Sequence, residues 1–496
     1  MREPTIGPMR RPAVVFCVTS ALLAASEGAN AARLPVLSAD GAVSTRAEPA
    51  VRAREAVDPA LTNLRERVTT PPAVTSASRT VLSELRRMRD RGVIDGATYR
   101  ERRDVYRDFR SVVPRYSGVR RTEMAGVLRL VDAFAARGKL TSSRLPALWL
   151  MLSRNRQWWS MGPLLAARQR VEFEGSELVW QYFPGAGLQF HPLANFGKLN
   201  WLARTKGLGA RSERLLDELL ELPARRAGGI AWEYSFDYGG GRAPWVSGLA
   251  QGTGLQSMSK AAVRAGRGDE VLPLLRQGLE VFETRPPQGI RVKGPGGGIH
   301  YLEYSFAPGL RILNGFIQSI VGLWDFAVTA SDERARRLFV EGERSARVEV
   351  PTFDTGAWSL YSRGTSMRES DLNYHVLVRD FLESLCDRYP ADVYCDAERN
   401  FTRYLDEAPE VRLQTRRLRA GRTQALRCRL SKISTVWVRV TRGDRVVLSR
   451  SAVLSYGRKA QWLTVPRRRG TYDVTFVSTD LAGNRGVLET TVDVVR

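Results

Sequence analysis

The chain is poor in the residues that usually bind transition metals. Its 496 residues contain four cysteines and three histidines, and the cysteine spacing matches no zinc-binding pattern. We therefore expect no metal site of the cysteine–histidine kind. Cys386 and Cys395 are near enough in sequence to close a small loop as a disulfide in an oxidising compartment. Cys428 has no obvious partner and is expected to be a buried thiol.

Phosphate-binding and dinucleotide-binding signatures are also missing. No glycine-rich loop of either kind stands between a predicted strand and a predicted helix. The sequence therefore gives no reason to expect a nucleotide, flavin or nicotinamide, and we predict no cofactor. A structural calcium ion is left open.

Long hydrophobic runs are absent after the N-terminus, so we do not expect a multispanning membrane protein. The N-terminus itself has the features of an export signal, with Arg10 and Arg11, an apolar core at 13–25, and small residues at Ala29 and Ala31. We expect residues 1–31 to be a signal peptide and the protein to be secreted or associated with the cell envelope. An uncleaved anchor is the alternative; after cleavage we expect no membrane span.

Acidic residues are clearly in the minority. Asp and Glu total 52 against 76 Lys and Arg, which gives a net charge of +24. Such a charge favours polyanionic partners, such as an acidic polysaccharide, a nucleic acid or an anionic surface. Arginine outnumbers lysine roughly ten to one, so part of the charge reflects GC-rich coding. No established nucleic-acid-binding motif is present, and we predict that nucleic acid is not a partner.

The pattern of apolar residues changes along the chain and suggests its domains. Helical periodicity dominates after about residue 76, as in the apolar stripe of 122–136, and period-two alternation dominates after about residue 410, as in 436–440. We expect a linker without regular structure, a helical region, a catalytic domain and a β-domain, at 32–75, 76–170, 171–408 and 411–496.

These patterns predict a mainly α fold class. Between about 192 and 405, helical segments alternate with short connections rich in glycine and aromatics, which favours antiparallel helix pairs. Pairs closed into a ring would form an α/α-barrel (toroid) whose loops converge on one cleft. The short strands after 410 predict a small all-β sandwich of immunoglobulin type without the Cys-Trp-Cys arrangement of antibody domains. Its role is either a structural appendage or glycan binding.

The stretch from Trp245 to His375 holds the candidate site. Glu303 is flanked by aromatic residues, which should desolvate the carboxylate and suit it to proton transfer. Tyr304, Tyr361 and Tyr374 stand at turns or element starts. A single tyrosine is usually core filler and a single glutamate is usually solvated. If 300–304 were a strand, Glu303 and Tyr304 would face opposite sides. The residues alone indicate an aromatic cleft that suits a sugar.

Several short motifs occur here in one order. They are PWVSGLAQG at 244–252, Glu303-Tyr304, LNGF at 313–316 with GLWD at 322–325, FDTG at 353–356 with Tyr361, and Tyr374-His375. In order and spacing this set resembles the D-glucuronyl C5-epimerase family over roughly residues 180–405. Two departures are Ser362, where the family often has Asp, and Trp358 within the glycine-rich turn.

The resemblance implies an α/α-barrel that inverts carbon 5 of glucuronate within a polysaccharide, giving iduronate. Removal of a weakly acidic proton and its return to the opposite face require acid–base groups on both faces of the ring. The family's functional residues carry over to Glu303, Tyr304, Tyr361 and Tyr374. Glu303 is the expected base, with Tyr374 or Tyr304 opposite it, and Tyr361 is expected to bind the sugar or its carboxylate.

Further side chains are candidates for substrate binding. They are Trp245, Asn314, Arg363 and His375. An arginine suits carboxylate recognition through its planar fork. Asn314 is interpreted mainly as a helix cap, and His375 is equally compatible with a structural role.

Two other functions remain open at this point. A polysaccharide lyase abstracts the same proton and then eliminates the glycosidic oxygen, and a non-catalytic envelope glycan-binding protein would keep the fold without turnover. The expected partner is an acidic polysaccharide containing glucuronate. A homodimer is compatible with the sequence.

Overall fold

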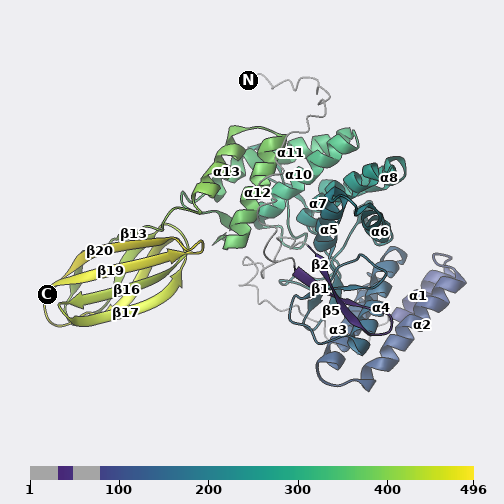
Figure 1. Cartoon of the computed structure of the whole chain (residues 1–496), viewed down its shortest axis with the longest axis horizontal. Coiled ribbons are helices and arrows are strands. Elements are labelled where there is room, and N and C mark those ends of the chain that lie inside the picture. Colours follow the sequence, from purple (N-terminus) through teal and green to yellow (C-terminus); the bar gives the residue numbers. More distant parts are fainter. Residues whose placement is uncertain (1–31, 49–78) are drawn as a thin grey trace.

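A computed structural model describes residues 32–48 and 79–496 of the chain. The molecule is elongated, with the C-terminal strands projecting as one end from the helical part (Figure 1). The predicted signal peptide and most of the predicted linker lie outside the described residues. Within the described ranges no helix is long and apolar enough to cross a bilayer.

The first described segment is a hairpin and not a linker. Strands β1 (Ala32–Leu37) and β2 (Val43–Glu48) pair antiparallel, and β1 also pairs parallel with β3 (Arg170–Phe173). The sheet continues through β4 (Trp180–Phe183) and β5 (Gly187–Phe190) in the order β2-β1-β3-β4-β5. The expectation of an unstructured linker is therefore corrected for residues 32–48, where Leu37 is fully buried.

Four helices pack beside this sheet. They are α1 (Val81–Asp90), α2 (Gly96–Val112), α3 (Gly118–Ala136) and α4 (Leu145–Met161). Buried Glu123 of α3 joins them to the β4–β5 turn, since its carboxylate accepts hydrogen bonds from the Tyr182 hydroxyl and from the backbone N–H groups of Gly185 and Gly187. Burial raises the pKa of Glu123 despite these bonds.

The middle of the chain is a row of helices backed by a second set. Helices α5, α7, α10 and α12 pack side by side in that order, and α6, α8, α11 and α13 pack against them in turn. Their bounds are α5 Pro192–Arg204, α6 Gly209–Leu220, α7 Gly248–Arg264, α8 Gly268–Gln277, α9 Glu280–Glu283, α10 Leu313–Thr329, α11 Glu333–Glu349, α12 Leu372–Arg388 and α13 Asp392–Arg403.

Helices α7 and α10 approach closely because glycines meet at their crossing. A Cβ on Gly322 would lie 2.2 Å from the Gly252 carbonyl oxygen, and a Cβ on Gly252 would lie 2.8 Å from the Ser319 Cα. Neither position has room for a side chain. Both positions therefore require glycine.

Short strands connect the helices. They are β6 (Ala224–Arg226), β7 (Gly229–Ala231), β8 (Arg291–Lys293), β9 (Ile299–Tyr301), β10 (Leu310–Ile312), β11 (Leu360–Gly364) and β12 (Arg368–Glu369). They form two-stranded pairs β6-β7 and β8-β9 and a three-stranded sheet β10-β11-β12.

The last part of the chain is built only from strands. They are β13 (Val411–Leu413), β14 (Arg417–Arg419), β15 (Thr423–Leu430), β16 (Ser434–Arg442), β17 (Arg445–Leu454), β18 (Gly457–Thr464), β19 (Gly470–Asp480) and β20 (Arg485–Val495). Two sheets, β13-β15-β18 and β14-β20-β19-β16-β17, share a core of their own that includes Phe476. Free Cys428 is buried in it.

The predicted fold class is wrong. The structure is 45% helical and 26% strand, with many sheets and a C-terminal half-barrel of strands, so it is not a mainly α protein. We therefore do not retain the α/α-barrel and immunoglobulin-type description. Strands such as β4 and β5 are only four residues long, and even their polar residues Gln181 and Gln189 are buried, so the sequence gives little signal for them.

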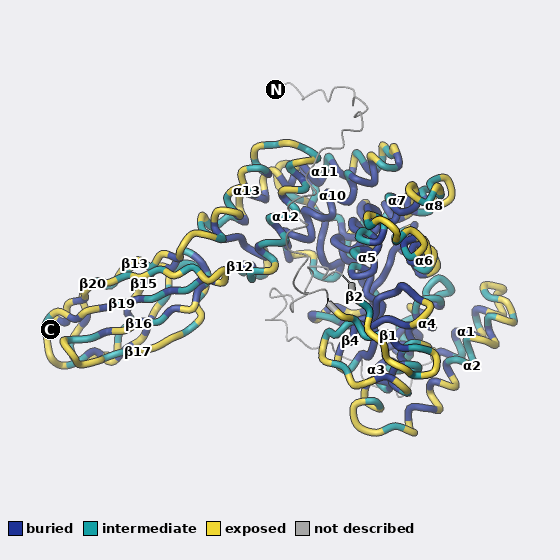
Figure 2. Tube along the Cα trace, in the orientation of Figure 1, coloured by how far each residue is buried: buried dark blue, intermediate teal, exposed yellow. Residues whose placement is uncertain are grey.

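Buried charge joins the C-terminal strands to the helices. Lys432, before β16, pairs with Asp480 at 2.7 Å while both side chains are 1% exposed. The Lys432 ammonium also donates to the Tyr404 carbonyl at 2.8 Å and lies 5.3 Å from the Trp358 ring centre. At the same junction, the Glu369 carboxylate of β12 accepts hydrogen bonds from the backbone N–H groups of Ile433 and Tyr456. In Figure 2, buried residues dominate the interior of the helical part, whereas buried and more exposed residues alternate along the C-terminal strands.

The junction yields a stability prediction. Asp480→Asn leaves the Lys432 ammonium buried without its counter-ion, so we expect the free energy of unfolding to fall by about 3–5 kcal/mol. The measurement is urea-induced unfolding followed by tryptophan fluorescence. Asp473→Asn, at an exposed position of the same strand, is the matched control and should change little. Equal midpoints for the two variants would contradict a stabilising role for the pair.

The glycine crossing yields a second prediction. Gly322→Ala places a methyl group against the Gly252 backbone, so we expect destabilisation of about 1–3 kcal/mol from overpacking. Gly209→Ala is the control, because that glycine is also helical and has no atom within 4 Å of its would-be Cβ. Thermal unfolding of both variants checks this. A Gly322→Ala protein as stable as Gly209→Ala would refute the close approach.

Candidate active site

One cavity of about 310 Å³ lies along the row α5, α7, α10 and α12. Its walls also include the 234–245 segment, the loop after β9, and β11. The four residues predicted to be functional from the family resemblance all line it, namely Glu303, Tyr304, Tyr361 and Tyr374. Residues that are as much as 71 positions apart in sequence therefore meet in one place.

Glu303 is fixed between two helix starts. Glu303 is buried, with an exposed fraction of 8%. Its Oε1 accepts a hydrogen bond of 2.9 Å from the Ser247 hydroxyl. Ser247 is itself the N-cap of α7 and accepts from the Ala250 N–H. On α10, a Cβ on Gly315 would lie 2.0 Å from Glu303 Oε2. The carboxylate therefore depends on a glycine at this position of α10.

Tyr304 belongs to an aromatic wall next to Glu303. Its ring centre lies 5.6 Å from Trp245, 6.0 Å from Tyr238 and 5.3 Å from Phe306. Strand β9 ends at Tyr301, so the chain is irregular at 303–304 and both side chains reach the same cavity. The alternation of a β-strand, which would have placed Glu303 and Tyr304 on opposite faces, is therefore absent here.

Tyr361 and Tyr374 form a second aromatic pair from other elements. Tyr361 lies on β11 and Tyr374 in the first turn of α12, and their ring centres are 4.5 Å apart at 53°. Asp371 caps α12 and accepts a 2.8 Å hydrogen bond from the Tyr374 N–H. The cap sets where the helix begins and thereby where the Tyr374 phenol stands.

The other predicted ligand-binding residues divide into two groups. Trp245 and Asn314 line the cavity. Asn314 is 3% exposed, and its Oδ1 has no hydrogen-bond partner among the described residues, which makes it an available acceptor. The cap interpretation of Asn314 is wrong, because the N-cap of α10 is Ile312 and no side chain caps that helix start. The next residue, Gly315, leaves the space that the Glu303 carboxylate occupies.

His375 and Arg363 do not line the cavity. His375 is fully buried, stacks on Trp358 with ring centres 3.6 Å apart, and contacts the Ser359 hydroxyl and the Phe401 carbonyl at 2.8 Å each. Its place is structural. Arg363 donates to the Thr352 carbonyl, away from the cavity.

Sequence reasoning missed several lining residues. Tyr234 stacks on Trp245 at 4.1 Å and 4°, and Tyr238 completes the same wall. The aromatic residues at alternate positions from 232 to 238 were a usable signal for this. The cavity also receives Arg168, Arg204 and Arg388; in a chain so rich in arginine, nothing in the local sequence marks these three.

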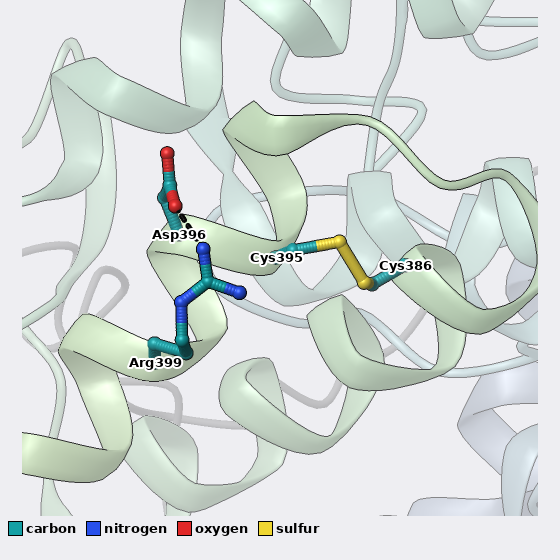
Figure 3. Close-up of a disulfide and its surroundings, with 4 residues drawn as sticks. All are labelled: Cys386, Cys395, Asp396 and Arg399. Atoms are coloured by element: carbon teal, nitrogen blue, oxygen red, sulfur yellow. Dashed lines mark hydrogen bonds and ion pairs between the residues drawn. A yellow bond between two sulfur atoms is a disulfide. The ribbon is translucent and has the colours of Figure 1, made fainter.

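The two cysteines predicted to pair do so. Cys386 of α12 and Cys395 of α13 form a disulfide with their Cα atoms 5.3 Å apart (Figure 3). The bond ties α12, which carries Tyr374, to the helix behind it. In the described part of the chain no group of three or more His, Cys, Asp or Glu residues is arranged to hold a metal ion.

The cavity thus combines one buried carboxylate, several phenols and an aromatic wall. Residues 227–403 match the family described as D-glucuronyl C5-epimerase C-terminus. A D-glucuronyl C5-epimerase of Caenorhabditis elegans is 28% identical over 151 residues, which cover 27% of this chain and 24% of that protein. The chain thus matches about a quarter of that relative's length. The predicted family resemblance is confirmed, and the matched region contains all four residues predicted to be functional.

The buried His375 gives a pH prediction. Burial, reinforced by the Lys432 charge, lowers the pKa of His375 to about 4 despite the hydrogen bond to Phe401. Above pH 6.5 the imidazole is neutral in both states. As the pH falls from about 6.5 to about 4, the unfolded chain gains a proton that the folded chain does not, so stability contributed by neutral His375 is lost.

The test compares the unfolding free energies of wild type and His375→Gln between pH 7.5 and 4. We expect the difference between the two proteins to narrow as the pH falls, because glutamine does not titrate. A difference that stays constant across this range would show that His375 is not the titrating group.

Proposed function

We propose that this protein is a uronyl C5-epimerase that converts glucuronate into iduronate within an acidic polysaccharide. The observation that carries the proposal is the convergence of Glu303, Tyr304, Tyr361 and Tyr374 on one cavity inside the family-matched region. All four side chains come from one chain, so the homodimer that the sequence allows is not needed to complete the site.

The proposed reaction breaks and remakes one C–H bond. A base removes the proton from carbon 5, and the electron pair of that bond moves into the adjacent carboxylate. An acid then supplies a proton to carbon 5 from the opposite face, and the electron pair returns to form the new C–H bond. The base ends protonated and the acid deprotonated, and both are reset by exchange with water. No external oxidant or cofactor enters this balance.

Glu303 is the proposed base on one face of the sugar. Its Ser247 hydrogen bond and its contact with the start of α10 hold the carboxylate in a single place. Tyr374 is the proposed acid on the other face, because it reaches the cavity from α12, whereas Tyr304 comes from the same loop as Glu303. Tyr304 is the alternative partner that a variant series distinguishes.

The intermediate carries extra negative charge on the sugar carboxylate, which must be stabilised. Tyr361 is placed to donate a hydrogen bond, since it lies against Tyr374 at 4.5 Å between ring centres. Arg168 lines the same cavity and supplies a positive charge. Trp245 and its stacked partner Tyr234 offer a flat apolar surface to the sugar ring.

We further propose that the protein acts outside the cytoplasm and uses no cofactor. Three features support this setting: the signal-like N-terminus, the Cys386–Cys395 disulfide and the net charge of +24. An extracellular or envelope polysaccharide rich in glucuronate fits the charge.

The test follows deuterium at carbon 5 when the protein is incubated with a glucuronate-containing polymer in heavy water. We expect incorporation by the wild type and a fall of about 10²–10⁴-fold in Glu303→Gln and in Tyr374→Phe. Glu213→Gln, at an exposed position, and Tyr116→Phe, in the N-terminal helical region, are matched controls that should retain activity.

Other outcomes separate the alternatives. Products that absorb in the ultraviolet as unsaturated uronates would identify a lyase. Binding of the polymer without deuterium incorporation would identify a glycan-binding protein. Full activity of folded Glu303→Gln would remove Glu303 from the mechanism.

A further inference from the structure

The four helices that line the cavity run in the same direction. Between α5 and α7, residue numbers increase in the same direction along both helices: Phe196 contacts Gly254, and Asn200 contacts Gln256. The same holds between α7 and α10, from Gly252 near Ser319 to Gln256 near Asp325. The helix N-termini thus gather at the Glu303 end of the cavity and their C-terminal parts gather at the other end.

The two ends of the cavity are well separated. Asn314 and Asp325 are eleven residues apart on α10, or about 16 Å along the helix axis, and Tyr374 and Arg388 are fourteen apart on α12, or about 21 Å. Between them the lining is uncharged and mixed: Leu377 and Phe381 are apolar, and the Gln256 side-chain oxygen accepts hydrogen bonds from Asn200 at 3.0 Å and from Gln318 at 3.1 Å. Such amides suit sugar hydroxyl groups.

The far end holds more positive than negative charge. The buried acidic residue at this end is Asp325. Its carboxylate forms ion pairs with Arg388 at 2.6 Å and with Lys260 at 2.5 Å. Burial alone would raise the pKa of Asp325, but hydrogen bonds from Arg388 and the Lys260 charge lower it, so the group is ionised. One carboxylate therefore faces two cations here, before Arg204 is counted.

Arg204 differs from its basic neighbours because, among the described residues, it forms no hydrogen bond or close ion pair, although the Asp325 charge lies near it. Arginines near helix C-termini often serve the helix itself. Arg388 does so by donating to the Ser384 carbonyl of its own helix, and Arg264 of α7 donates to the Ala203 carbonyl in the last turn of α5. Arg204 ends α5 and lines the cavity, yet among the described residues it has neither an acidic partner nor a carbonyl acceptor.

The surroundings of Arg204 increase its attraction for an anion. Arg204 is exposed at the edge of the cavity, but enough protein surrounds it to lower its pKa; the charges of Arg388 and Arg264 lower the pKa further, and the nearby Asp325 charge opposes this shift. A guanidinium keeps its charge at neutral pH despite such a shift. Its position, 23 residues before the family-matched region begins, makes it a feature that the match does not account for.

We propose that Arg204, supported by Arg388, forms an anion-binding subsite for an acidic group on a sugar residue distant from the reacting uronate. This inference rests on the proposed function, because it assumes that the cavity holds a polymer. The group is a carboxylate or a sulfate, both of which match a guanidinium fork. The separation along α10 and α12 means that a disaccharide at Glu303 does not reach the subsite, whereas a longer oligosaccharide does.

The test measures the affinity of full-length wild type, Arg204→Gln and Arg204→Lys for glucuronate-containing oligosaccharides of two, four, six and eight residues. We expect wild-type affinity to rise with length and Arg204→Gln to lose about 10-fold to 100-fold for the longer chains only. The loss should appear in KM and shrink with added salt. Arg204→Lys should recover part of it. Arg214→Gln, at an exposed position of α6 that does not line the cavity, is the matched control and should bind as wild type does.

Two sets of oligosaccharides distinguish a carboxylate from a sulfate as the bound group. One set is unsulfated, and the other is sulfated on the amino sugar. A defect of Arg204→Gln with the unsulfated set assigns a carboxylate, and a defect confined to the sulfated set assigns a sulfate.

The subsite and the epimerase proposal fail in different ways. Equal affinity of wild type and Arg204→Gln at every length overturns the subsite while leaving deuterium exchange by the wild type intact. Length-dependent binding that is lost in Arg204→Gln, without any exchange by the wild type, upholds the subsite and overturns the epimerase. If the wild type binds no oligosaccharide of either set, both proposals are wrong.

Discussion

The close crossing of α7 and α10 is the constraint on which the site depends. Backbone meets backbone at Gly252 and Gly322, so the two helices can lie nearer than side chains would allow. The same approach brings the Ser247 cap of α7 and the side-chain-free face of Gly315 on α10 to either side of Glu303. The carboxylate is thus positioned by the scaffold, which spares it the reorganisation that an exposed glutamate would undergo.

The parallel row of helices divides the cavity into chemically different ends. At the N-terminal end, one carboxylate and three phenols offer groups that can exchange protons. At the C-terminal end, arginines outnumber the single acid, Asp325. A polyanion would therefore be attracted along its length while only one of its sugars meets Glu303. The Cys386–Cys395 disulfide joins α12 to α13, and the buried Lys432–Asp480 pair lies where the C-terminal strands meet the helices.

Sequence reasoning found the candidate site more easily than the fold. Glu303 and Tyr374 stand in short motifs, and the structure brings both residues to one cavity. The strands β4 and β5 are four residues long and buried at every position, so the sequence did not distinguish strands from an irregular loop there. His375 adjoins Tyr374 in sequence, yet the helix turns it away from the cavity and onto Trp358. Arg204 is one arginine among many, and only the tertiary structure shows that it forms no hydrogen bond or close ion pair with the described residues.

The central claim is that two groups act on opposite faces of the sugar. The most direct measurement starts from glucuronate polymer in heavy water and analyses the first few per cent of product by NMR. The account predicts iduronate that already carries deuterium at carbon 5, while the remaining glucuronate still carries protium, because the removed proton and the delivered deuteron belong to different groups. Iduronate that retains the original protium, or a reaction that yields no iduronate, would contradict it.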